Sequence, residues 1–288
     1  MEGVLPVDKP AGPTSHDVVR AVRRVLEMRR VGHTGTLDPF ATGLLLVVLG
    51  RATRLAEYFS ALPKHYSAVM RLGAATDTDD ATGTVIAASD RWRAVDTAAL
   101  ERAAMTQTGT IRQRPPAYSA KKVGGQRAYD AARRGEERIL ESVDVHVSAL
   151  RITRVALPDV QLEVECSAGT YIRAIARDIG DVLGTHAHLV ELRRERIGSF
   201  AVADAVPLDV LDPARIRAAC IPPLEALAHL PRVAVDATAE AALSRGLAVP
   251  LAGPSPGGPV VASREGRLIA IAEVVDGMLQ PRKVFADV

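Results

Sequence analysis

One aspartate in a glycine-punctuated loop is the residue best suited to chemistry in this sequence. Asp38 lies within GHTGTLDPFATG at 32–43, between Leu37 and Pro39. The proline biases Asp38 toward an extended backbone, and the glycines allow tight turns on either side. A carboxylate on such a loop, in front of the apolar run LLLVVL, is suited to act as an exposed nucleophile. A simple Asp-Pro turn explains the same residues equally well.

Other patterns that carry chemistry are weak. The sequence has no GxGxxG, GxxxxGK(S/T) or HExxH pattern, so dinucleotide, P-loop and zinc-protease sites have no support. DTDDATG at 77–83 resembles the start of a calcium loop, but Ala81 and Thr82 stand where that loop needs Asp or Asn and then Gly. An Asx-rich turn is therefore expected. His186 and His188 have no adjacent third ligand, so no metal site is expected there.

The segment 111–140 carries a strong local positive charge. Eight basic residues against three acidic ones give it +5, in a chain whose net charge is +2. Tyr118 and Tyr129 are interleaved with the basic residues. This mixture is typical of elements that grip RNA, and a solvated, flexible arm has the same composition. The basic residues are Arg112, Arg114, Lys121, Lys122, Arg127, Arg133, Arg134 and Arg138.

Hydrophobic spacing predicts the elements that hold these residues. Thr14 and Asp17 form a capping box ahead of a helix. Residues 66–72 alternate as a strand, and the apolar spacing over 170–183 predicts a helix. Further helices are expected from about Thr53 and over 96–106, and further strands at about 142–155 and 160–166.

Helices and strands are interspersed without a strict βαβ rhythm. This order favours an α+β fold, with a mixed, largely antiparallel sheet flanked by helices. Prolines cluster between 207 and 231, and they place a domain boundary near Pro231. We therefore expect a catalytic domain over 1–230, containing the basic segment 111–140, and a small β-rich module over 231–288.

Composition excludes several classes of protein. The 288 residues are 48% hydrophobic and 24% charged, the balance of a soluble globular protein. The longest aliphatic run, Leu44 to Leu49, is far shorter than the roughly 20 residues that span a bilayer. The N-terminus shows no signal-peptide pattern. Cys166 and Cys220 are the two cysteines, which fits a reducing compartment, so a cytoplasmic location is expected.

Five ordered motifs over residues 3–200 resemble the TruB family of tRNA pseudouridine synthases, in its stand-alone bacterial type. The resemblance implies a pseudouridine synthase fold, and it implies that the C-terminal module is a PUA-like RNA-binding unit. The motifs are VDKPAGPTSHDVV followed by GHTGTLDPFATGLLLVVLG, KHYSAVMRLGAATDTDDATG, RQRPPAYSAKKVGGQRAYDAARRG, CSAGTYIRAIARDIG and AHLVELRR.

The resemblance also implies catalytic roles. Asp38 matches the catalytic aspartate, Tyr66 the tyrosine that stacks on the target base, and Arg173 the arginine that pairs with the aspartate and keeps it ionised. From the residues alone, Tyr66 would be a half-buried strand residue. A solvated helix arginine fits Arg177 better than Arg173. Whether Asp38 attacks the sugar, attacks the base or assists removal of a sugar proton stays open.

Substrate-binding residues follow from the same resemblance. His33 matches a histidine that helps hold the RNA with its target bases turned out. Tyr171 is expected to pack beside the site, and Leu192 to line the base pocket. The segment 111–140 matches an RNA-clamping insertion. The remaining predicted substrate-binding residues are Lys9, Arg114, Lys121 and Lys122.

The resemblance implies an isomerase that makes pseudouridine at position 55, in the T-loop of tRNA, after flipping the target base out of its stack. We expect it to act on the T-arm as a monomer, without a cofactor, a metal, a membrane or a protein partner. One alternative is a non-catalytic RNA-binding or RNA-folding protein. Another is a hydrolase or phosphoryl-transfer enzyme that uses Asp38 with a metal held by DTDD.

Overall fold

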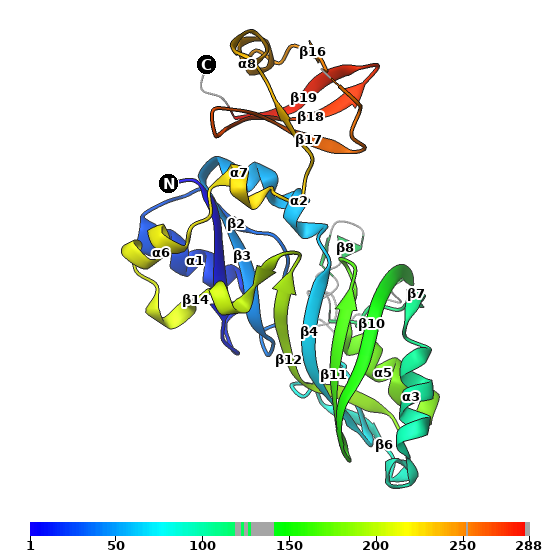
Figure 1. Ribbon diagram of the computed structural model, residues 1–288. Helices are drawn as coiled ribbons and strands as arrows, with labels where there is room; N and C mark the ends of the chain where they lie inside the picture. The colour runs from blue at the N-terminus through cyan, green and yellow to red at the C-terminus, as the bar shows by residue number, and fades with distance from the viewer. Residues whose placement is uncertain (119–121, 124–125, 128–140, 252, 286–288) are drawn as a thin grey trace.

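The computed structural model describes residues 1–118, 122–123, 126–127, 141–251 and 253–285 (Figure 1). It contains a ten-stranded sheet, a five-stranded sheet and two short two-stranded sheets. The two short sheets pair β5 (Ala74–Thr76) with β6 (Val85–Ala88) and β8 (Lys122–Val123) with β9 (Gln126–Arg127). In the described ranges no helix is long and apolar enough to cross a membrane.

The ten-stranded sheet is mixed and largely antiparallel, as predicted. Its central order is β14-β1-β3-β12-β4-β11-β10-β7, with β2 beside β3 and β13 beside β12. Among its pairs, β1–β14 and β3–β12 run parallel. The strands are β1 (Gly3–Lys9), β2 (Val31–His33), β3 (Thr42–Leu49), β4 (Lys64–Leu72), β7 (Gly109–Gln113), β10 (Val143–Ala156), β11 (Asp159–Cys166), β12 (Ala187–Ile197), β13 (Phe200–Ala201) and β14 (Val206–Pro207).

The helices begin and end largely where local signals place them. Thr14 and Asp17 form the predicted capping box of α1. The helix expected from about Thr53 is instead a 3-10 turn followed by the five-residue α2, which ends ahead of Pro63. The helices are α1 (Ser15–Leu26), η1 (Gly50–Leu55), α2 (Ala56–Ser60), η2 (Arg91–Ala94), α3 (Thr97–Met105), α5 (Ile172–Leu183), η3 (Val202–Asp204), η4 (Leu208–Val210), α6 (Pro213–Ala219), α7 (Pro223–Ala226) and α8 (Ala237–Ser244).

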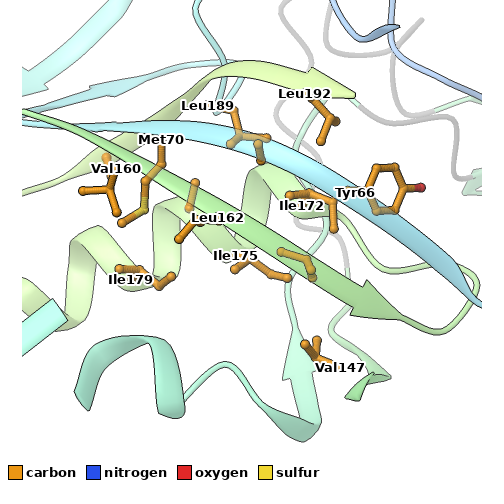
Figure 2. Close-up of a cluster of buried hydrophobic side chains, with 14 of the residues drawn as sticks. Tyr66, Met70, Val147, Val160, Leu162, Ile172, Ile175, Ile179, Leu189 and Leu192 are labelled. Atoms are coloured by element: carbon orange, nitrogen blue, oxygen red, sulfur yellow. The ribbon is translucent and has the colours of Figure 1, made fainter. Parts of the chain in front are cut away.

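A hydrophobic core lies between α5 and the strands β4, β11 and β12 (Figure 2). Ile175 and Ile179 of α5 pack there with Met70 and Leu162, and all four are almost fully buried. Each such side chain contributes roughly 1.5–3 kcal/mol by leaving water. Gly180 allows the close approach of α5, because an added Cβ would lie 2.4 Å from the Ala187 amide nitrogen. The core therefore fixes the first turn of α5 against the sheet.

The C-terminal unit is a five-stranded sheet in the order β15-β17-β18-β19-β16, with α8 packed on it. It rests on η1 and α2, since Phe285 and Ile271 share a hydrophobic cluster with Leu55 and Phe59. Arg54 Nη1 also donates a hydrogen bond to the Val284 carbonyl at 2.7 Å. Its strands are β15 (Arg232–Ala234), β16 (Val249–Pro250), β17 (Pro259–Arg264), β18 (Arg267–Val275) and β19 (Met278–Val284).

Candidate active site

A cavity of about 480 Å³ opens beside the carboxyl-terminal end of β2 and the start of α5. Its walls come from the loop 33–38, from β4 and β12, and from the turn 167–170. Cavities of this size accommodate small-molecule ligands. Folding gathers six of the predicted site residues around it: His33, Asp38, Tyr66, Tyr171, Arg173 and Leu192.

Asp38 sits on a loop whose backbone is held from outside. Ser15 Oγ donates to the Leu37 carbonyl at 3.1 Å and accepts from the Leu37 amide at 2.8 Å. The Gly12 amide donates to the Pro39 carbonyl at 2.8 Å. The loop is thereby fixed on both sides of Asp38, whose side chain remains 33% exposed to the cavity.

Arg173 reaches Asp38 from the first turn of α5 and is almost fully buried. Its Nε lies 2.9 Å from Asp38 Oδ2, and its Nη1 lies 3.3 Å from Asp80 Oδ2. Nη1 donates to the Thr78 carbonyl at 2.7 Å, and Nη2 donates to the Tyr118 carbonyl at 2.8 Å. One guanidinium therefore joins three loops that are far apart in the sequence.

Asp80 is a site residue that sequence interpretation missed. The DTDDATG segment forms the expected turn, in which Asp80 Oδ1 accepts from the Thr82 amide and from Thr78 Oγ1, both at 2.9 Å. The other carboxylate oxygen faces Arg173, and the side chain is buried. The only signal in the sequence was a cluster of acidic residues. The turn thus supplies a second carboxylate to the active-site arginine.

The charge balance at Asp38 differs from the one that the sequence predicts. Arg173 was expected to hold the pKa of Asp38 down, and it does lower it. Burial, which penalises the ionised form, outweighs that effect and raises the pKa of the Asp38 carboxyl, and the like charge of Asp80 adds to the rise. A more basic carboxylate is a stronger proton acceptor and nucleophile.

Tyr66 is both a core residue and a wall of the cavity. It is buried on β4, between Val164 of β11 and Arg194 of β12 in strand register. In Figure 2 its ring stands at one end of the hydrophobic cluster. Burial raises the pKa of the Tyr66 hydroxyl, while the positive charge and a hydrogen bond of Arg194 oppose that rise. The tyrosine thus offers the cavity a flat ring fixed on a strand.

Three further predicted residues line the cavity: His33, Leu192 and Tyr171. The first two lie on strands, and the third is held by the side-chain amide of Gln113. His33 ends β2 and is half-buried, and Leu192 is buried on β12. Gln113, fully buried at the end of β7, holds Tyr171 on both sides. Its Nε2 donates to the Tyr171 carbonyl at 3.0 Å, and its Oε1 accepts from the Tyr171 amide at 2.8 Å. Sequence reasoning did not identify Gln113.

The prediction that Lys9 binds substrate does not fit its position. Lys9 is fully buried, does not line the cavity, and directs its Nζ at the carbonyls of Pro10, Pro13 and Pro39, at 2.8, 2.9 and 3.3 Å. Burial lowers the pKa of Lys9 to about 8. Pro39 directly follows Asp38, so Lys9 supports the backbone of the Asp38 loop.

The basic segment is only partly described. Arg114 lies outside the cavity, and its carbonyl accepts from Arg177 Nη2 at 2.9 Å. Lys121 falls outside the described residues, and for Lys122 only the backbone in β8 is described. Arg177, expected to be solvated, is largely buried and pairs with Asp79 at 2.8 Å. The RNA contacts of Arg114, Lys121 and Lys122 stay predictions.

The arrangement suits covalent or acid–base chemistry on a small ligand with a flat ring. An aromatic ring and the apolar Leu192 form walls, and a carboxylate paired with an arginine faces the same space. Within the described ranges, no group of three or more His, Cys, Asp and Glu side chains is placed to hold a metal ion. A ligand in the cavity would therefore meet the Asp38 carboxylate, the Arg173 guanidinium and the Tyr66 ring.

Comparison with known families agrees with this geometry. Residues 23–172 match the model for the TruB family pseudouridylate synthase N-terminal domain, and residues 173–229 match the model for the tRNA pseudouridylate synthase B C-terminal domain. Fold and site thus define a pseudouridylate synthase, an isomerase. More narrowly, the chain belongs to the TruB family.

Two of the curated relatives match along almost the whole chain, and a third matches over about three-quarters of it. The chain is 44% identical to tRNA pseudouridine synthase B of Thermobifida fusca, with 99% of each chain covered. It is 41% identical to the protein of the same name from Heliobacterium modesticaldum, covering 99% of this chain and 96% of that one. The Mycobacterium tuberculosis protein of that name is 45% identical, with 73% and 71% covered.

Solved structures share the fold. A chain in an H/ACA RNP bound to a substrate RNA containing 2'-deoxyuridine is 28% identical, with a TM-score of 0.74, and covers 99% of this chain and 85% of that one. A chain in a Cbf5-Nop10-Gar1 complex is 29% identical, with a TM-score of 0.75 and the same coverage. The likeness extends over both sheets.

Proposed function

We propose that this enzyme converts the uridine at position 55, in the T-loop of tRNA, into pseudouridine. The observation that carries the proposal is the Asp38–Arg173 pair, 2.9 Å apart, in the cavity that Tyr66 and Leu192 also line. The relatives named tRNA pseudouridine synthase B support tRNA as the substrate. The T-arm is the part of the tRNA that the enzyme recognises, chiefly by its shape.

Asp38 acts as the nucleophile toward the bound nucleotide, and the bond that its carboxylate forms is broken again before the product leaves. The N1–C1′ glycosidic bond breaks, the detached base rotates, and a C5–C1′ bond forms. The C5 proton is then lost and N1 gains a proton, so atoms and charge balance without an oxidant or a donated group. This balance is the reason why no cofactor is required. Arg173 orients the Asp38 carboxylate, and Tyr66 stacks on the base, which is worth about 1–3 kcal/mol.

The target base must leave the folded T-loop before Asp38 can reach it, which costs a few kcal/mol. His33, half-buried at the rim of the same cavity, helps to keep the RNA open. Residues 1–230 form the catalytic domain, whose basic segment 111–140 clamps the RNA. Residues 231–288 form a PUA-like unit that contacts the tRNA away from the target. The enzyme acts as a cytoplasmic monomer.

The test is an assay of pseudouridine in an unmodified tRNA transcript and in an isolated T-arm hairpin, with EDTA present. The wild type should give one modified site, in the T-loop of both RNAs, and Asp38→Ala should give none. Tight RNA binding without product from either protein would favour the alternative of an RNA-binding or RNA-folding protein. Modification of whole tRNA but not of the hairpin would refute recognition through the T-arm alone.

A further inference from the structure

A second arginine beside the cavity has an unusual environment. Arg194 of β12 is 2% exposed and lines the cavity together with Asp38 and Tyr66. In the described part of the chain it makes no ion pair with a carboxylate. Burial lowers the pKa of Lys9 and of Lys64, and the positive charge of Arg194 lowers both further. A buried cation without an anionic partner disfavours folding, and its field acts strongly where little water screens it.

The guanidinium of Arg194 donates to the backbone of the catalytic loop. Its Nη2 donates to the Gly35 carbonyl at 3.2 Å and its Nη1 to the Thr36 carbonyl at 3.3 Å. Its Nε donates to the Leu44 carbonyl at 2.7 Å, at the start of β3. Arg194 therefore fixes the loop residues that precede Asp38 and also the start of β3, the strand that follows Asp38.

The main chain around Arg194 is also fixed by close packing. Gly43 of β3 pairs in parallel with Arg194 and has φ +101°. A Cβ at this glycine would lie 2.4 Å from the Arg194 carbonyl oxygen and 2.7 Å from its amide nitrogen. Only glycine permits this approach, because a Cβ at position 43 would collide with the Arg194 backbone.

On its other side Arg194 faces Tyr66. The two residues are register partners on β12 and β4. We propose that Arg194 is a positioning residue of the isomerase, which fixes the Asp38 loop through two carbonyls and presents a positive charge to the Tyr66 hydroxyl. This inference rests on the proposed function, because it assigns roles to Asp38 and Tyr66 in that reaction.

The first test compares Arg194→Lys with Arg193→Lys. Arg193 is the adjacent residue, is partly exposed and pairs with Asp8 at 2.8 Å, so it is a matched control outside the cavity. Lysine keeps the charge at 194, but its single nitrogen lacks the planar fork by which three guanidinium nitrogens reach the carbonyls of Gly35, Thr36 and Leu44. With unmodified tRNA, R194K should lower kcat by about tenfold or more and leave KM within about threefold. R193K should match the wild type.

A second variant tests the charge. Arg194→Met removes it. If the charge acts on the Tyr66 hydroxyl, the factor by which R194M lowers kcat should be smaller in a Tyr66→Phe background, which lacks that hydroxyl. A purely structural role would lower kcat by the same factor in both backgrounds. If circular dichroism shows that R194K or R194M is unfolded, Gly43→Ala replaces it in the test. This substitution displaces the Arg194 backbone without changing the charge of the side chain. It should lower kcat at constant KM.

The proposal is overturned if folded R194K keeps a kcat within twofold of the wild type, or if R194K raises only KM. Where G43A replaces an unfolded variant, an unchanged kcat overturns it. An equal loss from R194M in the wild-type and Tyr66→Phe backgrounds overturns the assigned effect on Tyr66. These failures are distinct from failure of the proposed function, in which the wild type itself forms no pseudouridine in tRNA.

Discussion

Asp80 Oδ2 lies 3.3 Å from Arg173 Nη1, and both side chains are buried. Asp38 approaches the same guanidinium at 2.9 Å but is partly open to the cavity. Arg173 is therefore anchored by Asp80, whose carboxylate is buried. The Nε of Arg173 faces Asp38, whose carboxylate is open to the cavity. Such an anchor holds Asp38 in place without the mobility of an exposed ion pair.

Asp80→Asn should lower kcat by about tenfold to a hundredfold, because a small displacement of Arg173 carries over to Asp38. Asparagine keeps the oxygen that accepts from the Thr82 amide, so the turn should persist. Asp77→Asn is the control, since Asp77 is exposed and accepts from the Thr84 amide at 2.8 Å instead. Equal rates for the two variants in a tRNA assay would contradict the anchoring role.

Asp38→Asn should abolish turnover while the melting temperature stays equal or rises. The raised pKa of Asp38 means that folding disfavours its ionised form, so a neutral isostere relieves that penalty at pH 7. Calorimetry on the two proteins checks the stability, and pseudouridine analysis checks the activity. A large drop in melting temperature would show that the ion pair with Arg173 stabilises the fold more than burial opposes it.

The pH dependence of kcat/KM should report the same shift. As the proposed nucleophile, Asp38 must be ionised, so the acid limb should fall above pH 3.8, the ordinary value for aspartate, and D80N should move it lower. The stability of the folded protein depends on pH in the opposite direction to the activity. The folded state binds this proton more tightly, so the contribution of Asp38 to stability decreases as pH rises through its folded pKa. An acid limb at or below pH 3.8 would contradict the assignment.

Lys9→Met separates support of the loop from contact with RNA. Because Lys9 holds the Pro39 carbonyl and is fully buried, kcat should fall about tenfold while the Kd for tRNA stays within about twofold. If Lys9 contacted a phosphate, its replacement would instead weaken the binding of tRNA. It would also reduce the salt dependence of binding by about one ion. Filter binding at several salt concentrations, beside single-turnover rates, decides between these roles.

Features that depend on near neighbours along the chain could be predicted from the sequence. The capping box at Thr14 and the alternation around Tyr66 predict their elements, because caps and periodicity are local properties. The ordered motifs of the TruB family identified Asp38, Tyr66 and Arg173, which the structure places around one cavity. The mixed, largely antiparallel sheet followed from the order of helices and strands.

The way in which these residues are held and charged depends instead on packing between distant segments. Asp80, Gln113 and Arg194 act on partners that are far away in sequence, so no local pattern reveals them. Lys9 appears as an accessible basic residue in a turn until folding buries it against three carbonyls. The pKa of Asp38 likewise depends on desolvation and on charges from other loops. Burial and long-range electrostatics arise from packing in three dimensions, which the order of residues encodes only through the complete fold.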